Sequence, residues 1–162
     1  MDQLLPLAGQ IAARLIARKE TIAVAESSTG GLIAAALLAL PGASAYFLGG
    51  AVVYTKAARG GLMGIGDADM QGLRPSTEAY SALIANRVRE RLGATWSIGE
   101  TGAAGPTGNR YGDPAGHTCI AIAGPVARAV TLRTGSADRR ANMEAFAKRA
   151  LELAQEVLNS SP

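Results

Sequence analysis

The sequence predicts a three-layer α/β/α sandwich, in which a mixed β-sheet lies between two layers of helices. Segments with helical periodicity alternate with short apolar, β-prone segments along the chain, which is typical of sheets covered by helices on both faces. The last two β-prone segments, His117–Ala123 and Val126–Thr134, are joined by Gly124-Pro125, which predicts an antiparallel hairpin. The length of 162 residues suits one domain, so we expect residues 1–162 to fold as a unit.

The N-terminal part contains a predicted helix, strand, turn and second helix. Apolar residues recur at helical spacing through residues 2–19, which predicts the first helix. Thr21–Ala25 is short and apolar, which is typical of a buried strand. The turn Glu26–Gly31 follows it directly and leads to an Ala/Leu-rich helix over Leu32–Leu40, which Pro41-Gly42 ends.

The middle of the chain contains a second strand and a long helix. Tyr46–Tyr54 includes an apolar, β-prone stretch, and a short helical piece is predicted after it. Pro75-Ser76 marks the start of a helix that reaches about Leu92, with Ser76 as the expected N-cap. Glu78 falls in the first turn, where a carboxylate interacts favourably with the helix dipole.

The C-terminal half contains a third strand, a long loop, the hairpin and a closing helix. Thr95–Gly99 is β-prone and precedes the polar, glycine-rich segment Glu100–Gly116. A loop of 17 residues is unusual in a compact domain, and such loops are more often functional than accidental. Asp138 is the expected cap of a final helix over about residues 139–158.

Composition and charge exclude several classes of function. The net charge is +3 and no basic stripe is interleaved with aromatic residues, so we expect no nucleic-acid partner. Cys119 is the single cysteine, which excludes an internal disulfide and a thiolate metal site and favours a reducing compartment. His117 is the single histidine and is expected to be structural, so no metal is predicted. No run approaches the roughly 18 apolar residues that span a bilayer, so we expect a cytoplasmic protein without a membrane anchor.

The first candidate site is the turn Glu26–Gly31, with the sequence ESSTGG between a strand end and a helix start. Backbone amides at such a turn bind a phosphate or an oxyanion. The hydroxyl of Ser27 is a candidate nucleophile if a base lies close to it. The turn lacks the GxxxxGK[ST] spacing of a P-loop, and a simple helix cap is an equally good interpretation.

The second candidate site is the segment Tyr54–Arg59, where the second strand ends. A desolvated Lys56 could deprotonate a serine or a water molecule, and the hydroxyl of Tyr54 could relay a proton or orient the group that is attacked. The ordinary alternative is a strand terminus with Lys56 and Arg59 in solvent. Spacing alone does not decide between these interpretations.

The third candidate site is Glu100–Asn109, directly after the third predicted strand. Ligands of open α/β sheets bind outside the carboxyl ends of the strands. We therefore expect Thr101–Gly105 to lie beside Glu26–Gly31 and to contact the same small ligand. Convergence of two such segments favours a nucleotide-like ligand.

The chain contains four short motifs, which are Ala25–Gly31, Pro41–Ser44, Tyr54 with Leu62–Gly64, and Thr101–Pro106. Together they resemble the C-terminal domain family of CinA, the competence/damage-inducible protein. Each motif is weak alone, but the four occur in the family's order and spacing across nearly the whole chain. The resemblance implies an α/β/α domain with a mixed, roughly five-stranded sheet and a homo-oligomer. Many family members also carry an N-terminal domain related to molybdopterin-binding proteins, and we expect this chain to be a stand-alone version without it.

Characterised members of this family are nicotinamide-nucleotide amidases. They hydrolyse nicotinamide mononucleotide to nicotinate mononucleotide and ammonia in pyridine-nucleotide salvage, without a cofactor. The resemblance therefore implies an amidohydrolase with Ser27 as the active serine and Tyr54 beside it. The substrate-binding residues that we expect are Thr29, Gly30, Gly31, Arg59, Thr101, Gly102 and Gly105.

The chain departs from the family five residues after Tyr54, where the family has a lysine and this sequence has Arg59. A guanidinium stays protonated at physiological pH and cannot accept the serine proton. We therefore expect Lys56 to act as the base, with Glu100 as the alternative, and Arg59 to bind the substrate phosphate. The competing hypothesis is a catalytically silent domain that binds a nucleotide without hydrolysing it.

Overall fold

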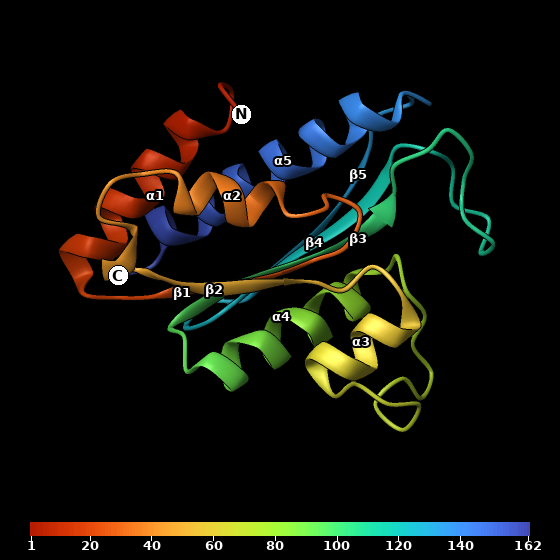
Figure 1. Cartoon of the computed structure of the whole chain (residues 1–162), viewed down its shortest axis with the longest axis horizontal. Coiled ribbons are helices and arrows are strands. Elements are labelled where there is room, and N and C mark those ends of the chain that lie inside the picture. The colour runs from red at the N-terminus through yellow and green to blue at the C-terminus, as the bar shows by residue number, and fades with distance from the viewer.

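The structure, a computed structural model, describes all 162 residues and confirms the predicted α/β/α sandwich (Figure 1). Five strands form one sheet in the order β2-β1-β3-β4-β5. Their bounds are β1 (Ile22–Glu26), β2 (Phe47–Val52), β3 (Trp96–Ala103), β4 (His117–Ala123) and β5 (Arg128–Arg133). Strand β1 is parallel to β2 and β3, while β4 is antiparallel to β3 and β5, so the sheet is mixed and contains the predicted hairpin.

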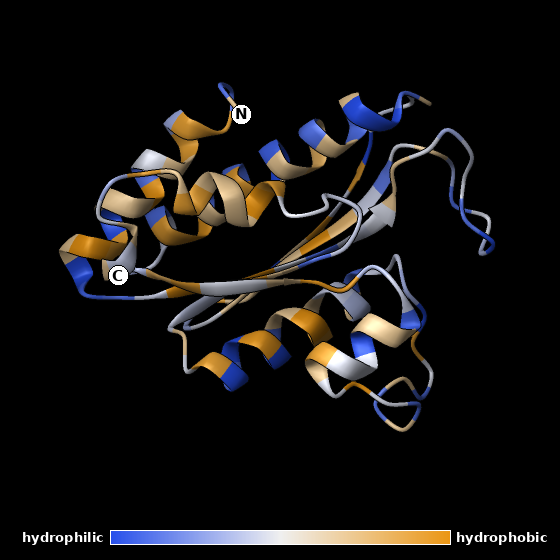
Figure 2. Ribbon diagram, in the orientation of Figure 1, coloured by the Kyte–Doolittle hydropathy of each residue, from blue (hydrophilic) through white to orange (hydrophobic).

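Helices cover both faces of the sheet. One face carries α1 (Leu5–Arg18), α2 (Leu32–Leu38) and α5 (Arg139–Ser160), and the other carries α3 (Lys56–Met63) and α4 (Glu78–Leu92). A short 3-10 turn, Ala43–Ala45, lies between α2 and β2. Figure 2 shows hydrophobic residues on the sides of the helices that face the sheet. None of the helices has the length and apolar character needed to cross a membrane.

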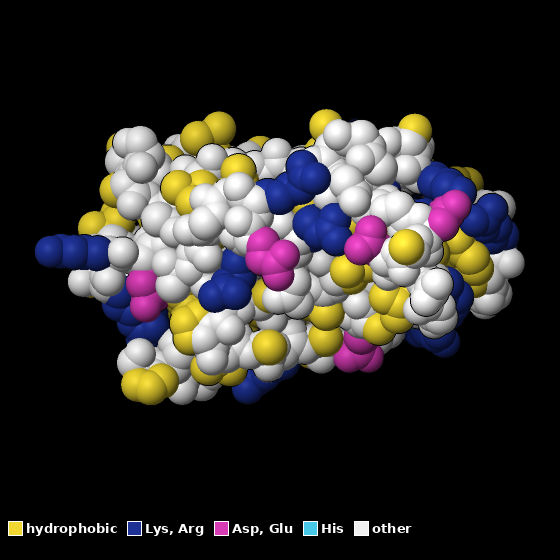
Figure 3. Space-filling model, turned by 90° about the horizontal axis from the view of Figure 1, so that it is seen from below, with side chains coloured by type: hydrophobic (Ala, Val, Ile, Leu, Met, Phe, Trp, Pro, Cys, Tyr) yellow, Lys and Arg dark blue, Asp and Glu magenta, His cyan; other side chains and the backbone are white.

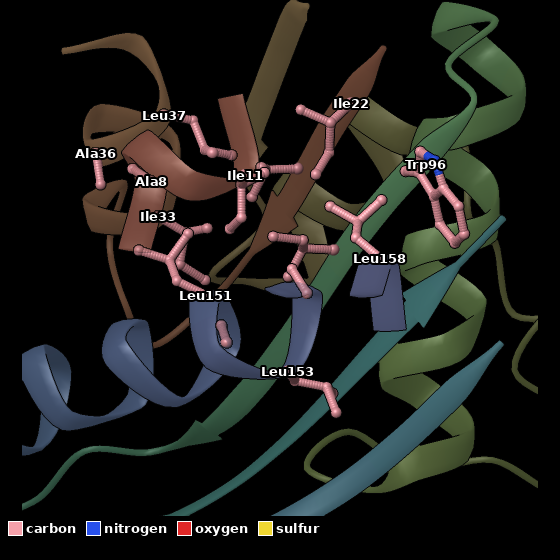
Figure 4. Close-up of a cluster of buried hydrophobic side chains, with 14 of the residues drawn as sticks. Ala8, Ile11, Ile22, Ile33, Ala36, Leu37, Trp96, Leu151, Leu153 and Leu158 are labelled. Carbon is pink, nitrogen blue, oxygen red and sulfur yellow. The ribbon is translucent and has the colours of Figure 1, made fainter. Parts of the chain in front are cut away.

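The larger hydrophobic core lies between the sheet and the layer of α1, α2 and α5. Ile11 of α1, Leu37 of α2 and Leu151 of α5 belong to it with Ile22 of β1 (Figure 4). A smaller cluster on the other face includes Ile84 of α4. Because both faces of β1 are buried, its five residues are all apolar except the last, Glu26.

Capping residues explain where the helices around the site begin and end. Thr55 caps α3 and Asp138 caps α5, each by accepting a hydrogen bond from a backbone N–H. Gly64 and Gly93, both with positive φ, end α3 and α4. The predicted cap at Asp138 is therefore confirmed.

Two predicted boundaries are wrong. Ser76 does not cap α4, because it has a φ of 61°, and the side chain of Thr77 caps the helix instead. Strand β3 continues through Glu100–Ala103, because β4 pairs with it as far as Ala103. The predicted loop 100–116 is consequently shorter by these residues, and Glu100 has the fixed orientation of a strand residue.

The parallel arrangement brings the carboxyl ends of β1, β2 and β3 to one end of the sheet. The segment after β3, helix α3 and the N-terminus of α5 lie at the same end, on the right in Figure 1. Helix α4 packs closely on β3 because Gly99 has no side chain, and a Cβ there would collide with the carbonyl oxygen of Ser81. The fold therefore collects its polar segments at one end of the sheet.

Candidate functional site

The last residue of β1, Glu26, organises the turn that follows it. Its carboxylate is 0% exposed and accepts hydrogen bonds from the backbone N–H groups of Gly31 (2.8 Å), Ile33 (3.2 Å) and Ala34 (2.9 Å). Burial raises the pKa of Glu26, and these hydrogen bonds together with one from Thr29 act in the opposite direction. The N-cap residue of α2 makes no side-chain hydrogen bond, so Glu26 accepts the hydrogen bonds of the first backbone N–H groups of this helix in its place.

A second buried carboxylate, Glu100 of β3, reaches across to the same turn. Its Oε2 accepts hydrogen bonds from the backbone N–H groups of Ser27 (3.0 Å) and Thr29 (3.1 Å). Its Oε1 accepts from the hydroxyl of Ser28 and from the hydroxyl of Thr118 at 2.8 Å. The negative charge of Glu100 is satisfied by these donors, which fix the shape of the serine-containing turn.

Thr29 lies between the two carboxylates. Its Oγ1 is 2.7 Å from Oε1 of Glu26 and 3.0 Å from Oε2 of Glu100. A hydroxyl donates a single proton, so both contacts are hydrogen bonds only when one of the carboxyls is protonated. The predicted contact between Thr29 and substrate is wrong, because Thr29 is 0% exposed and fully engaged in this bridge.

A cavity of about 260 Å³ lies beside this turn, and we call it the serine cavity. It is lined by Ser28, Tyr54, Gly102–Gly105, Thr107–Asn109 and Arg139. Arg139 joins two of its walls, because its guanidinium donates to the hydroxyl of Tyr54 at 3.1 Å and to the carbonyl of Gly105 at 2.5 Å. The predicted convergence of Glu26–Gly31 with Thr101–Gly105 is confirmed.

The two adjacent serines have different environments. Ser27 is half-buried, its hydroxyl makes no hydrogen bond within the chain, and it does not line the serine cavity itself. Ser28 is 4% exposed, lines the cavity and donates its hydroxyl proton to Glu100. The backbone N–H of Ser28 has no acceptor within the chain. The turn therefore offers a free hydroxyl on Ser27 and a free amide on Ser28.

Gly30 and Gly31 do not offer free amides. The N–H of Gly30 donates to the carbonyl of Ser27 at 3.2 Å, and that of Gly31 donates to Glu26 at 2.8 Å. The prediction that these amides bind the substrate is therefore wrong for this geometry. Their φ angles, 63° and 103°, explain why the turn uses glycine. Gly102 lines the serine cavity, where its contact with substrate stays a prediction, and a Cβ there would collide with the backbone of β4.

Two further predicted site residues point elsewhere. Thr101 is 2% exposed and its hydroxyl accepts the N–H of Ser76 at 3.0 Å, because successive residues of β3 face opposite sides of the sheet. Lys56 is the first residue of α3, its side chain is 76% exposed, and its ammonium pairs with Asp67 at 3.1 Å. The predicted roles of Thr101 in binding and of a desolvated Lys56 as the base are therefore wrong.

Arg59 is buried beside a second cavity of about 510 Å³, which we call the arginine cavity. The residue is 8% exposed, its Nε has no hydrogen-bond partner, and its guanidinium carbon lies 5.9 Å from the ring centroid of Tyr80. The arginine cavity is lined by Tyr54, Lys56, Arg59, Met70, Leu73, Arg74, Pro75 and Asn109–Tyr111. Tyr54 and Asn109 line both cavities, so the two are neighbours.

Asp113 holds the loop after β3 in place. It is 6% exposed and accepts hydrogen bonds from Arg74 and Asn109, both at 2.8 Å. The hydrogen bond from Arg74 is the main reason why the pKa of Asp113 is lowered to about 2, against the opposing effect of burial. His117 accepts from Arg133 on Nδ1 at 3.2 Å and donates from Nε2 to a backbone carbonyl at 2.9 Å, which agrees with the predicted structural role.

Reasoning from the sequence missed two residues that shape the serine cavity. Arg139 is the first residue of α5, and Asn142 lies one turn further on. The side-chain amide of Asn142 donates to the carbonyl oxygens of Ala104 (2.7 Å) and Ser136 (2.8 Å), so it ties the cavity wall to α5. Polar residues directly after the Asp138 cap of this amphipathic helix were the available signal.

Comparison with known proteins gives the same fold and a family. The family model described as CinA C-terminal domain matches residues 4–158. CinA-like proteins from Gloeobacter violaceus and Salinibacter ruber are 41% identical over 131 residues and 39% identical over 145 residues. These matches cover 80% and 90% of this chain but 31% and 35% of the relatives, so the chain spans about a third of their length.

Solved structures of CinA-related proteins superpose on nearly the whole chain. A CinA superfamily protein from Klebsiella pneumoniae has a TM-score of 0.90 at 26% identity, with 98% of this chain and 99% of that chain covered. The competence/damage-inducible protein CihA from Agrobacterium tumefaciens has a TM-score of 0.88 at 28% identity, with coverages of 98% and 96%. The chain, with its ESSTGG turn and its serine cavity, therefore belongs to the CinA C-terminal domain family.

Proposed function

We propose that the chain is a nicotinamide-nucleotide amidase, which hydrolyses nicotinamide mononucleotide to nicotinate mononucleotide and ammonia. The observation that carries this proposal is the serine cavity. In a CinA-family fold, the serine turn, Tyr54, Arg139 and the Gly102–Gly105 segment surround one small space. Amide hydrolysis needs a hydroxyl or water as the nucleophile, donors for an oxyanion and a proton acceptor, and this end of the sheet provides all three.

In this proposal Ser27 is the nucleophile or orients the attacking water. Its hydroxyl is free of internal hydrogen bonds and therefore available to a carboxamide beside Ser28. The free N–H of Ser28 and the guanidinium of Arg139 are the donors that stabilise the developing oxyanion. Tyr54, oriented by Arg139, positions the carboxamide, and the cationic pyridinium ring of the substrate makes its carbonyl carbon more electrophilic.

Glu100 takes the role of proton acceptor, because Lys56 is hydrated and Arg59 stays protonated. The Ser28 hydroxyl connects Glu100 to the cavity. The proton of the nucleophile passes to the Ser28 oxygen while the original Ser28 proton moves to Glu100. When the C–N bond breaks, the same path returns a proton to the leaving nitrogen, which departs as ammonia. If Ser27 is the nucleophile, a water molecule then attacks the acyl-Ser27 ester, gives a proton back to the Ser27 oxygen and releases nicotinate mononucleotide. If Ser27 orients the attacking water, the carboxylate forms directly in the first attack.

A second candidate function is binding of a nucleotide without hydrolysis. It is favoured by Arg59 at the position of the family lysine and by the absence of a base hydrogen-bonded to the Ser27 hydroxyl. In that case the serine turn and its two carboxylates would serve only to shape a binding site. Nucleotide affinity would then persist without any release of ammonia.

The experiment that separates these functions measures ammonia release and binding on the same preparations. Purified protein is incubated with nicotinamide mononucleotide, and Ser27→Ala and Glu100→Gln variants are measured in parallel. The amidase proposal expects turnover by the unsubstituted chain and losses in both variants, with affinity for the nucleotide retained. Binding without ammonia release from the folded, unsubstituted chain would favour the second candidate.

A further inference from the structure

The arginine cavity carries positive charge that the protein does not neutralise. Its lining includes no acidic side chain and four basic ones, Lys56, Arg59, Arg74 and Arg110. Two of these pair with Asp67 and Asp113 outside the lining. Arg59 and Arg110 belong to no ion pair. In the view of the side that carries α3 and α4, basic and acidic side chains are otherwise interspersed (Figure 3).

Arg59 is the stronger indication that this charge has a ligand. The residue is 8% exposed, and its buried Nε has no hydrogen-bond partner in the protein. The ring of Tyr80 supplies a cation–π contact at 5.9 Å, which does not replace a hydrogen-bond acceptor for Nε. No carboxylate pairs with this largely buried guanidinium, and a buried charge without a partner is unfavourable, so its acceptors must come from water or from a bound anion.

The other two arginines of the cavity are held in place by one aromatic ring. The guanidinium carbons of Arg74 and Arg110 each lie 5.1 Å from the ring centroid of Tyr111. Arg110 also donates to the Tyr111 hydroxyl at 3.0 Å, and Arg74 is fixed by Asp113. Their positions are therefore largely set before a ligand binds, which reduces the entropic cost of binding.

We propose that the arginine cavity binds phosphate, either as the free ion or as a phosphate monoester. Guanidinium groups form paired, charge-assisted hydrogen bonds with phosphate oxygens, and they stay charged at any physiological pH. Tyr54 and Asn109 line both cavities, so a ligand held by its phosphate beside Arg59 extends toward Ser28. That this phosphate is the phosphate group of nicotinamide mononucleotide rests on the proposed function. Phosphate binding in the arginine cavity does not itself require turnover.

Isothermal titration calorimetry tests this proposal with three probes. These are inorganic phosphate, nicotinamide mononucleotide and nicotinamide riboside, which lacks the phosphate. We expect phosphate to bind and to compete with the mononucleotide, and the riboside to bind at least about 10-fold more weakly than the mononucleotide. If the mononucleotide binds no more tightly than inorganic phosphate, the ligand of the arginine cavity is the free ion.

Substitutions locate the phosphate within the chain. Arg59→Gln is expected to weaken phosphate and mononucleotide binding by about 10-fold or more, and the exposed Arg110→Gln by several-fold. The control is Arg87→Gln, because Arg87 pairs with Asp69 and lines neither cavity. Circular dichroism checks folding, and Arg110→Gln carries the test if Arg59→Gln does not fold.

Two results would overturn the phosphate site. One is the lack of saturable binding of both phosphate and the mononucleotide to the unsubstituted chain. The other is equal affinity of the unsubstituted chain for the mononucleotide and the riboside, with mononucleotide affinity unchanged in Arg59→Gln and Arg110→Gln. Failure of the amidase proposal has a different signature, because phosphate binding that responds to Arg59 and Arg110 would remain while no ammonia is released.

Discussion

The bridge formed by Thr29 between two buried carboxylates leads to a specific stability prediction. Thr29→Val keeps the shape of the side chain but removes the hydroxyl that lies 2.7 Å from Glu26 and 3.0 Å from Glu100. A hydrogen bond to a charged group contributes about 1.5–3 kcal/mol, and the group left behind remains buried. Because the hydroxyl contacts both buried carboxyl groups, we expect a loss of about 2–4 kcal/mol in the free energy of unfolding.

Urea denaturation at neutral pH measures this loss, with Thr131→Val as the control. Thr131 also donates to a glutamate, Glu78, at 3.0 Å, but both residues are exposed, so we expect a change below about 0.5 kcal/mol. With a slope of about 2 kcal/mol per molar urea, the Thr29→Val midpoint should fall by about 1–2 M. Equal shifts in the two variants, or a Thr29→Val loss below about 0.5 kcal/mol, would contradict the bridge.

Further predictions concern packing, pH dependence and the proton path. Gly99→Ala is expected to destabilise the fold by about 3 kcal/mol in the same urea assay, because its Cβ would collide with α4. Gly61→Ala is the control, because Gly61 lies within α3 and has no atom close to the position of its Cβ, so we expect it to stabilise the fold by about 0.5–1 kcal/mol. The pKa of Asp113 is lowered to about 2 from an ordinary 3.8, so the stability that this carboxylate contributes is complete above pH 3.8 and is lost as the pH falls through 2. Unfolding followed by fluorescence at pH 5 and below should show this decline. The Arg74→Gln variant should show a smaller decline, because it lacks the main cause of the lowered pKa. Ser28→Ala is expected to lower ammonia release by about 10-fold, which is less than the loss in Ser27→Ala, because a water molecule can replace the Ser28 hydroxyl in the proton path. Unchanged turnover in Ser28→Ala would argue against the path to Glu100.

Local patterns in the sequence were sufficient to predict the layers and most element boundaries. The cap at Asp138 and the hairpin around Gly124-Pro125 depend on neighbouring residues alone, and both are present. The convergence of Glu26–Gly31 with Thr101–Gly105 follows from strand order, because both segments lie at the carboxyl ends of neighbouring parallel strands. These features could be predicted because each is determined by local chemistry or by a general rule of sheet topology.

The parts of the site that depend on register could not be predicted. Glu100 reaches the serine turn because β1 and β3 pair with Ala25 opposite Gly99, and no local pattern specifies that register. Lys56 and Arg59 lie three residues apart on a short helix, yet one is exposed and the other buried against Tyr80. Their environments depend on how α3 packs, so the choice between them as the base needed the structure.

Arg59 stands where the resemblance to the CinA family implies a lysine, and this difference affects the proposed chemistry. A lysine at that position could exchange a proton, whereas a guanidinium stays charged. Glu100, hydrogen-bonded to Ser28, is the ionisable group that contacts the serine turn from another strand. We therefore expect a role for Glu100 in proton transfer and a role for Arg59 in holding an anion.

Ammonia release from nicotinamide mononucleotide, compared between the unsubstituted chain and Ser27→Ala, tests the central claim most directly. The amidase proposal predicts stoichiometric formation of ammonia and nicotinate mononucleotide, with a loss of about 100-fold or more in Ser27→Ala while the nucleotide still binds. An Arg59→Lys variant measured alongside shows whether restoring the family residue adds activity. Folded, nucleotide-binding protein that releases no ammonia, or that releases it equally well without the Ser27 hydroxyl, would contradict the assignment of this site.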